Sequence, residues 1–273
     1  MTAGRSVPPG RSGSSAPAAP RSIADRLGMI AVVMGFGFSL GQGMLVLPLL
    51  ALAAGYDAAA VGLLTSVSAI AQVSLRLTLP RLLARYPDRT MMAIACLLLA
   101  ASYGALLVST SLLAFLAAQL LQGGGRAYFW TSSQTHAIRS GAGSGKGIAE
   151  VTIWGNVGTF LGPAVAGVLA TASLVYPVYV GIAFALVALV ASAGLSRLPT
   201  YDRKAARGEG RMWRRAGVDL ACWSNIAAGG WRALLNSYVP VILQGVGHSP
   251  AVIGAIQSMA DLFVTASAVA LAR

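Results

Sequence analysis

Two stretches of the chain, PLLALAAGYDAAAVGLLTS at residues 48–66 and PVILQGVGHSPAVIGAIQS at residues 240–258, align without a gap at an offset of 192 residues. The identical positions are small or turn-forming residues: Pro48 with Pro240, Gly55 with Gly247, Gly62 with Gly254, and Ser66 with Ser258. Each stretch joins the end of one apolar segment to the start of the next. We therefore expect the same helical hairpin twice, once in each of two related halves.

Long apolar segments continue on both sides of each hairpin. The chain is 56% hydrophobic and only 10% charged, against roughly 25% charged residues in soluble domains. Each segment reaches the roughly 20 residues that a helix needs to cross about 30 Å of hydrocarbon. We therefore predict an all-α integral membrane protein, a polytopic bundle of eight transmembrane helices over residues 28–54, 59–80, 91–109, 112–138, 148–171, 174–196, 218–244 and 251–272.

Basic residues fall on alternate connections. Lys and Arg cluster in the N-terminal tail and after the second, fourth and sixth segments, whereas the connections at 56–57, 109–111, 172–173 and 247–249 contain neither. Because cytoplasmic loops retain Lys and Arg, this pattern predicts a multi-pass protein of the plasma membrane with a cytoplasmic N-terminus. Topology and attraction to the lipid bilayer account for the net charge of +12, so no nucleic-acid partner is expected.

Composition divides the chain into four parts. Residues 1–26, rich in Pro, Gly, Ser and Arg, predict a disordered cytoplasmic tail. Residues 27–197 predict an N-terminal six-helix bundle, 198–216 a basic cytoplasmic loop, and 217–273 the first two helices of a second bundle. Such repeated halves are typical of transporters with a substrate site near the midplane between them.

The connection after the second segment resembles a gating loop of the major facilitator superfamily. LPRLLARYPDR (79–89) is similar to the family pattern G-x-L-a-D-R-x-G-R-R and retains Leu82, Arg85 and Arg89. Pro80, Ala84 and Pro87 replace its Gly, Asp and Gly. In the fourth segment, QLLQGGGR (119–126) resembles R-x-x-q-G-x-g, with Gln119 at the arginine position and Arg126 seven residues later.

The fifth segment contains GTFLGPAVAG (158–167), which resembles the G-x-x-x-G-P-x-x-G-G motif of proton-coupled drug exporters through Gly158, Gly162, Pro163 and Gly167. Gly155, Gly158, Gly162 and Ala166 fall at spacings of three and four, so they form a stripe of small residues that permits close helix approach. Pro163 removes a backbone donor and should bend the helix. On the family's pattern, the stripe is expected to pack against the helix at 251–272.

Three charged residues lie deep inside apolar segments, whereas Arg76, Glu150 and Asp219 lie near segment ends. Arg126, Arg232 and Asp261 are each predicted to be roughly 15–21 Å from a helix end, given a rise of 1.5 Å per residue. Charges at this depth mark cavities, relays or substrate paths. An ion pair between Arg232 and Asp261 is expected, with either a structural or a coupling role, and Asp261 is the candidate for exchanging a proton for a substrate cation.

Four uncharged polar residues are further candidates for substrate contact: Gln42, Gln72, Asn225 and Asn236. Hydrogen bonding between helices is their commoner use in membranes. His136 and His248 have no second ligand at helical spacing, so no metal site is expected. The sequence also lacks GxxxxGK[ST], GxSxG and HExxH motifs. We therefore expect no enzyme activity and no cofactor, with a proton gradient as the energy source.

The resemblance implies a secondary active transporter for a small-molecule substrate. The leading hypothesis is proton-coupled efflux of a small amphipathic or cationic compound by alternating access. One alternative is an uptake permease for a sugar or an organic anion. Family members usually have twelve helices, so an alternative from another class is a truncated membrane fragment that does not transport.

Overall fold

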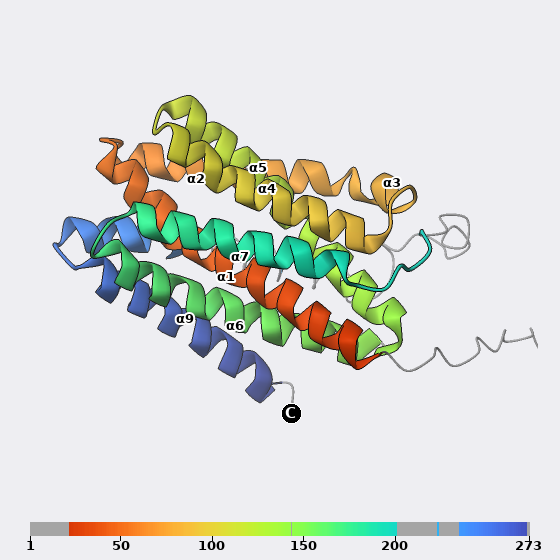
Figure 1. The fold of residues 1–273 in the computed structure, drawn as a ribbon. Coiled ribbons are helices and arrows are strands. Elements are labelled where there is room, and N and C mark those ends of the chain that lie inside the picture. Colours follow the sequence, from red (N-terminus) through yellow and green to blue (C-terminus); the bar gives the residue numbers. More distant parts are fainter. Residues whose placement is uncertain (1–21, 143, 201–222, 224–234, 272–273) are drawn as a thin grey trace, which may run out of the picture.

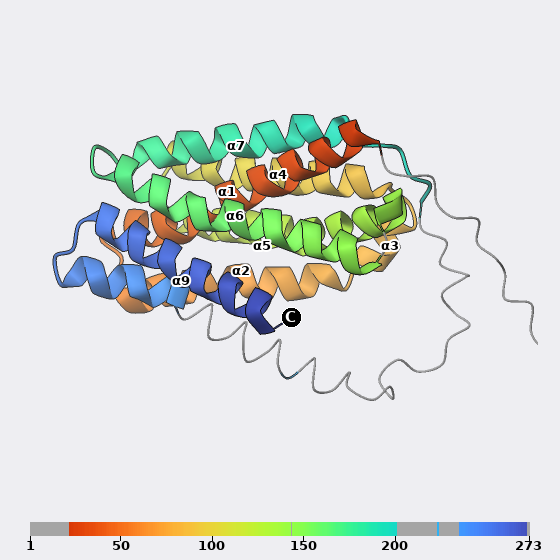
Figure 2. The ribbon, with the colours of Figure 1, turned by 90° about the horizontal axis from the view of Figure 1, so that it is seen from below.

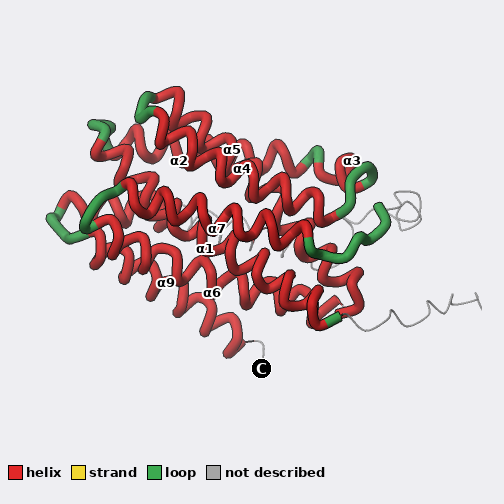
Figure 3. The backbone as a smooth tube through the Cα atoms, in the orientation of Figure 1, coloured by secondary structure: helices red, strands yellow, loops and turns green. Residues whose placement is uncertain are grey.

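The structure is a computed structural model and describes residues 22–142, 144–200, 223 and 235–271. These residues form long helices joined by short turns (Figure 3). The elements, labelled in Figure 1, are α1 (Ile23–Ala53), α2 (Ala58–Arg76), α3 (Leu79–Leu83), α4 (Asp88–Val108), α5 (Leu112–Ala137), η1 (Ile138–Ala142), α6 (Ser144–Ala170), α7 (Val175–Ala193) and α9 (Pro250–Leu271). Residues 235–245 are also helical.

Helix starts follow local capping chemistry. Asp57 Oδ1 accepts the Ala60 N–H at 2.7 Å and begins α2, and Ser111 begins α5 in the same way. Ser22 accepts the Asp25 N–H, so α1 begins four residues before the predicted bundle start at 27. The segment predicted over 59–80 instead ends at Arg76, and α3 follows separately with Pro80 in its first turn.

Among the described residues, five helices are long and apolar enough to cross a membrane: α1, α2, α4, α6 from Gly145 onward, and α7. α5 has 26 residues but is not among them, because Gln119, Gln122 and Arg126 lower its hydropathy. Within the described residues, Pro250–Phe263 of α9 is a shorter apolar helical stretch. Five of the eight predicted spans are therefore confirmed by length and composition, and most of 218–244 lies outside the described residues.

The basic connections gather at one end of the bundle, here called the basic end. It carries α3, the turn from α5 to α6, and the end of α7, with Arg81, Arg85, Arg139, Lys146 and Arg197 (Figure 1). The turns at the opposite end, around 54–57, 109–111, 171–174 and 246–249, contain no Lys or Arg. The separation of charge predicted from the sequence is therefore present in the fold.

The hairpin repeat is confirmed in backbone detail. Helices end at 53 and 245 and resume at 58 and 250, which preserves the offset of 192 residues. Gly55 and Gly247 adopt φ values of 91° and 92°, the left-handed conformation that favours glycine after a helix end. The Tyr56 N–H donates to the Ala51 carbonyl at 3.0 Å, and its counterpart, from His248 to Leu243, has the same length.

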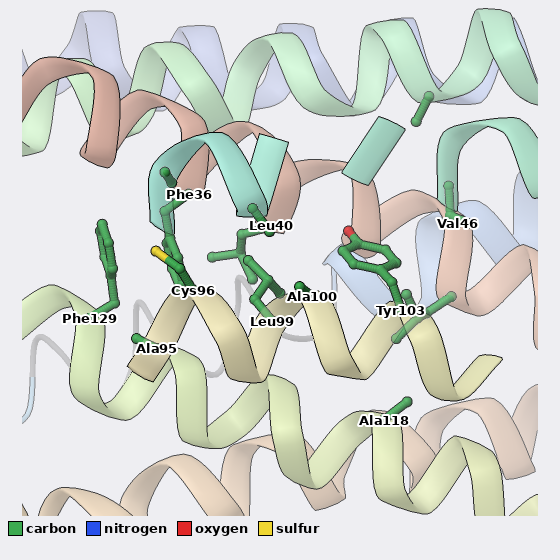
Figure 4. Packing of buried hydrophobic residues seen from close by; sticks show 14 of the residues in the cluster. Phe36, Leu40, Val46, Ala95, Cys96, Leu99, Ala100, Tyr103, Ala118 and Phe129 are labelled. Carbon is green, nitrogen blue, oxygen red and sulfur yellow. The ribbon is translucent and has the colours of Figure 1, made fainter. Parts of the chain in front are cut away.

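α1 occupies the centre of the bundle. It packs against α6 on one side and α7 on the other, α4 lies between α7 and α5, α2 lies on α5, and α9 lies on α6 (Figures 1 and 2). Figure 4 shows Cys96, Leu99 and Tyr103 projecting from α4 toward α1. All three side chains are fully buried, so the apolar core is formed mainly by the first six-helix region.

Glycines bring the backbones of α1 and α6 into contact. A Cβ atom at Gly37 would lie 2.6 Å from the Gly155 carbonyl oxygen, and one at Gly162 would lie 2.7 Å from the Gln42 backbone nitrogen. At Gly41 the added atom would lie 2.6 Å from the carbonyl oxygen of Thr159, whose usual donor is missing because of Pro163. The predicted stripe therefore packs on α1.

The expected partnership of this stripe with the helix at 251–272 is wrong for its glycines at 155, 158 and 162. α9 instead contacts the next part of α6: a Cβ atom at Gly167 would lie 3.1 Å from the Cα atom of Gly254. The physical reason is the helical period: Gly167 follows Gly158 by nine residues, which places the two on opposite faces of α6. α6 therefore presents small residues to two neighbours.

We predict that Gly158→Ala destabilises the protein by about 1–3 kcal/mol, the usual cost of forcing a methyl group into a packed contact. The new Cβ atom would lie 2.7 Å from the Phe38 backbone nitrogen, and a backbone cannot move aside as a side chain can. Thermal unfolding in detergent measures the effect. Gly145→Ala is the matched control on α6, since nothing lies within 4 Å of its Cβ position; equal stability of the two variants would contradict the prediction.

Candidate functional site

The described residues before the second hairpin contact α1 and α2 through polar side chains. Asn236 Nδ2 donates to Met44 Sδ on α1 at 3.4 Å, and Ser237 Oγ donates to Thr65 Oγ1 on α2 at 3.0 Å. Met44 and Asn236 are themselves 192 residues apart. Two equivalent positions of a repeat meet only near the axis that relates the copies, so this contact lies close to the pseudo-two-fold axis.

α9 faces α6 through a row of small and polar residues. Gly254 lies against the Pro163 carbonyl, and Ser258 Oγ donates to the Phe160 carbonyl at 2.7 Å. Asp261, which is half-buried, follows Ser258 by three positions and Gly254 by seven. Residues at these spacings share one face of a helix, so Asp261 belongs to the face of α9 that lies between the halves.

Arg126 is held in a tightly packed part of α5. The glycines just before it permit close helix contact, since a Cβ atom at Gly125 would lie 3.0 Å from the Ala95 carbonyl oxygen of α4. One turn later, Phe129 stacks on Phe36 of α1 with ring centroids 3.7 Å apart (Figure 4). Arg126 itself is half-buried, so its backbone is fixed while its side chain remains partly accessible.

Contacts with α6 give the relative depth of these two charges. The ring of Trp130 lies against Gly155, and Arg126 is about one turn from Trp130 toward the turns opposite the basic end. Asp261 is about one turn from Ser258 toward the basic end, and Ser258 contacts Phe160. Measured along α6, both charges therefore lie between residues 155 and 160. The fold places Arg126 and Asp261 at about the same depth.

Gln42 lies in the interior of the first half. Its side chain is fully buried, and neither amide atom has a hydrogen-bond partner among the described residues. A Cβ atom at Gly181 of α7 would lie 3.2 Å from Gln42 Oε1, so the amide reaches toward α7. Nearby, the Tyr103 hydroxyl donates to the Ser39 carbonyl, and Ser39 Oγ donates to the Gly181 carbonyl at 2.8 Å.

Tyr103 and Ser39 were not identified from the sequence. Both are fully buried, and together they connect α4, α1 and α7 through hydrogen bonds in the apolar core. Tyrosine is abundant on membrane-exposed faces as well, so residue type alone carried no signal for this role.

The remaining polar candidates have different surroundings. Gln72 on α2 is half-buried beside Gly123 of α5, and Asn236 makes the interhelical bond to Met44. Arg232 and Asn225 lie outside the described residues, as does the predicted ion pair between Arg232 and Asp261.

The predicted gating-loop residues lie at the basic end. Leu82 packs on an apolar cluster formed by Leu79, Leu83 and Met91, whereas Arg85 is exposed. Arg89 Nη1 donates to the Ala193 and Leu195 carbonyls at 3.3 and 3.2 Å. This loop therefore fastens the end of α7.

An apolar pocket of about 590 Å³ lies at the opposite end, where both hairpins meet α6 and α7. Its lining includes Leu49 of α1, Leu174 before α7, and Val241, with Gln244 as a polar group. None of the described residues that line it is ionisable, so apolar groups match these walls best. Within the part of the chain that the structure describes, no cluster of His, Cys, Asp and Glu could hold a metal ion.

Comparison with protein families gives one match: the model for the Major Facilitator Superfamily covers residues 27–273. A search of curated proteins gave no match. The matched range begins within α1 and includes both hairpins, in agreement with the resemblance of the three sequence motifs.

We predict that Tyr103→Phe lowers the free energy of unfolding by about 1–2 kcal/mol, because the Ser39 carbonyl loses a buried donor while the ring packing is retained. Thermal unfolding with and without the hydroxyl measures this difference. Tyr179→Phe on α7 is the control, since that tyrosine is 56% exposed. An unchanged midpoint for Tyr103→Phe would show that the hydrogen bond does not support the core.

Proposed function

The chain belongs to the major facilitator superfamily, and from this premise we propose that it is a secondary active transporter exporting a small amphipathic or cationic compound in exchange for protons. Membership makes it a multi-pass membrane transporter. Positive residues at one end favour a cytoplasmic basic end in the plasma membrane.

The position of Asp261 carries the proposal of proton coupling. It lies on the face of α9 between the halves, one turn from the bond between Ser258 and Phe160. An ionised carboxylate at bilayer depth costs several kcal/mol unless it is paired or hydrated. A carboxylate on this boundary can bind a proton from water on one side and release it to water on the other. Alternate exposure to the two sides of the membrane would therefore carry protons across.

The contacts between the halves suit alternating access. Among the described residues they include close glycine packing between α6 and α9 and the hydrogen bonds from Asn236, Ser237 and Ser258. Interhelical hydrogen bonds in membranes average about 0.6 kcal/mol each, so these three bonds add little to the free energy needed to separate the halves. The halves can therefore rock about α6 without unpacking the first bundle.

Two features support an amphipathic substrate. The pocket of about 590 Å³ offers apolar walls. Asp261 offers a carboxylate that can bind either a proton or a substrate cation. Arg126, at the same depth, favours the alternative of an uptake permease for an organic anion. A guanidinium binds carboxylates and phosphates by paired hydrogen bonds.

We predict that Asp261→Asn abolishes proton-driven flux while substrate exchange without a gradient continues, because an amide cannot bind the proton. The measurement uses vesicles containing the full chain and a fluorescent organic cation, with and without an imposed pH gradient. Asp57→Asn is the matched control, since Asn caps a helix as well as Asp does. Unchanged coupled flux in Asp261→Asn would remove Asp261 from the mechanism.

We also predict that Arg126→Gln lowers the KM for the organic cation several-fold, since it removes a like charge at substrate depth. Arg126→Lys keeps the charge and should leave that KM unchanged. Transport assays with both variants measure the difference, and the exposed Arg197→Gln is the control. If KM for the cation is unaffected but KM for an organic anion rises, the permease alternative is favoured.

A further inference from the structure

A histidine and a carboxylate meet in the protein interior at the basic end. Asp25 lies in the first turn of α1 and is 7% exposed, while His136, in the last turn of α5, is fully buried. The distance from His136 Nε2 to Asp25 Oδ2 is 3.7 Å. The two residues are far apart in the sequence, so this pairing exists only in the folded bundle.

The same carboxylate holds the start of the connection between the halves. Asp25 Oδ1 accepts the Ser196 N–H at 2.8 Å. Ser196 follows the end of α7, directly before the chain leaves the first bundle. Arg89 binds the Ala193 and Leu195 carbonyls, and Arg139 donates to the Pro199 carbonyl. Three side chains therefore bind residues 193–199, and of these Asp25 is the buried carboxylate.

The neighbouring elements carry other charged groups at the basic end. Arg26 of α1 pairs with Glu150 of α6 at 2.6 Å, and Arg139 of η1 pairs with Asp88 of α4 at 3.0 Å. Further basic groups described at this end are Arg81 and Arg85 around α3, Arg89 of α4, Lys146 of α6 and Arg197 after α7. Glu150 and Asp88 each have an arginine partner, and the charge of the His136 side chain that lies beside Asp25 depends on pH.

Helix ends favour the charged form of both residues. The N-terminus of α1 carries partial positive charge and stabilises the Asp25 carboxylate, while the C-terminus of α5 carries partial negative charge and stabilises a protonated His136. Each helix has more than 20 residues, so both dipoles are fully developed. The arrangement is suited to binding a proton between two opposed helix ends.

We propose that His136 and Asp25 form a second proton-binding site, which fastens residues 193–199 when the proton is bound. A proton from water adds to the imidazole, and the resulting cation compensates the Asp25 carboxylate while it holds the Ser196 N–H. Loss of the proton returns it to water and leaves a buried carboxylate with less compensation, which favours release of Ser196. The site is distinct from Asp261, and only its meaning for transport rests on the proposed function.

The direction of the pH dependence follows from this linkage. The state in which Asp25 holds Ser196 binds the proton more tightly than the released state. The free energy that favours this state is therefore greatest at low pH and is lost as pH rises through the range in which histidine titrates, about pH 5 to 8. His136 and His248 are the two histidines of the chain. His248 is exposed in the turn at the opposite end, so His248→Gln is a matched control.

Amide hydrogen exchange of the Ser196 N–H tests the site without substrate or gradient. Rates are divided by those of an unfolded peptide of the same sequence at each pH. We expect protection to fall about tenfold from pH 6 to pH 8 in the native protein and in His248→Gln, and to be independent of pH in His136→Gln. The same fall in His136→Gln, or none in the native protein, would overturn the proposal.

A second measurement avoids any change in the pair itself. In His248→Gln the remaining histidine is His136, so its ring signal can be followed by nuclear magnetic resonance from pH 5.5 to pH 8.5. We expect titration within this interval, and absence of titration would refute the second site. Neither experiment measures flux. A negative result in them would not bear on Asp261, and a negative result in the flux assay of Asp261→Asn would not bear on the site formed by His136 and Asp25.

Discussion

The close contact between α1 and α6 is the constraint on which the arrangement of the other helices depends. Within a bilayer, burial of apolar side chains does not by itself drive helices together, so close packing and hydrogen bonds must supply the attraction. Gly37 and Gly41 on α1 meet the small residues of α6 at backbone distance. Since α1 also packs against α7, and α7 against α4, this one contact positions the core of the first half.

Glycine at these positions also resolves a problem created by Pro163. A proline within a helix leaves the carbonyl four residues earlier without its usual donor, which is tolerable in a membrane only where protein or water covers it. The Thr159 carbonyl lies against Gly41, so the backbone of α1 covers it. The adjacent part of α6 contacts α9 at Gly254. The residues that weaken α6 as an isolated helix thus allow it to serve both halves.

Local features of this fold could be predicted from the sequence, and long-range partners could not. The hairpin repeat followed from an alignment, because turn geometry is encoded by residues a few positions apart, as in Gly55 and Gly247. The glycine stripe on α6 predicted close approach, but a stripe does not specify which helix approaches. The pairing of His136 with Asp25 joins distant segments and had no local pattern. The polar residues in the middle of α5, Gln119, Gln122 and Arg126, lower its mean hydropathy, so α5 is not among the helices found apolar enough to span a membrane.

The contacts inside the first half differ in kind from those between the halves. Inside the first half, backbone-to-backbone packing of α1 on α6 is reinforced at the basic end by the ion pairs of Arg139 with Asp88 and Arg26 with Glu150. The described contacts between the halves include the hydrogen bonds from Asn236, Ser237 and Ser258 and the close backbone crossing of α6 and α9 at Gly254. On the proposed function, a rigid-body motion between the halves would have to rearrange these contacts. Asp261 lies on the same face of α9 as Ser258 and Gly254, so such a motion would change its surroundings.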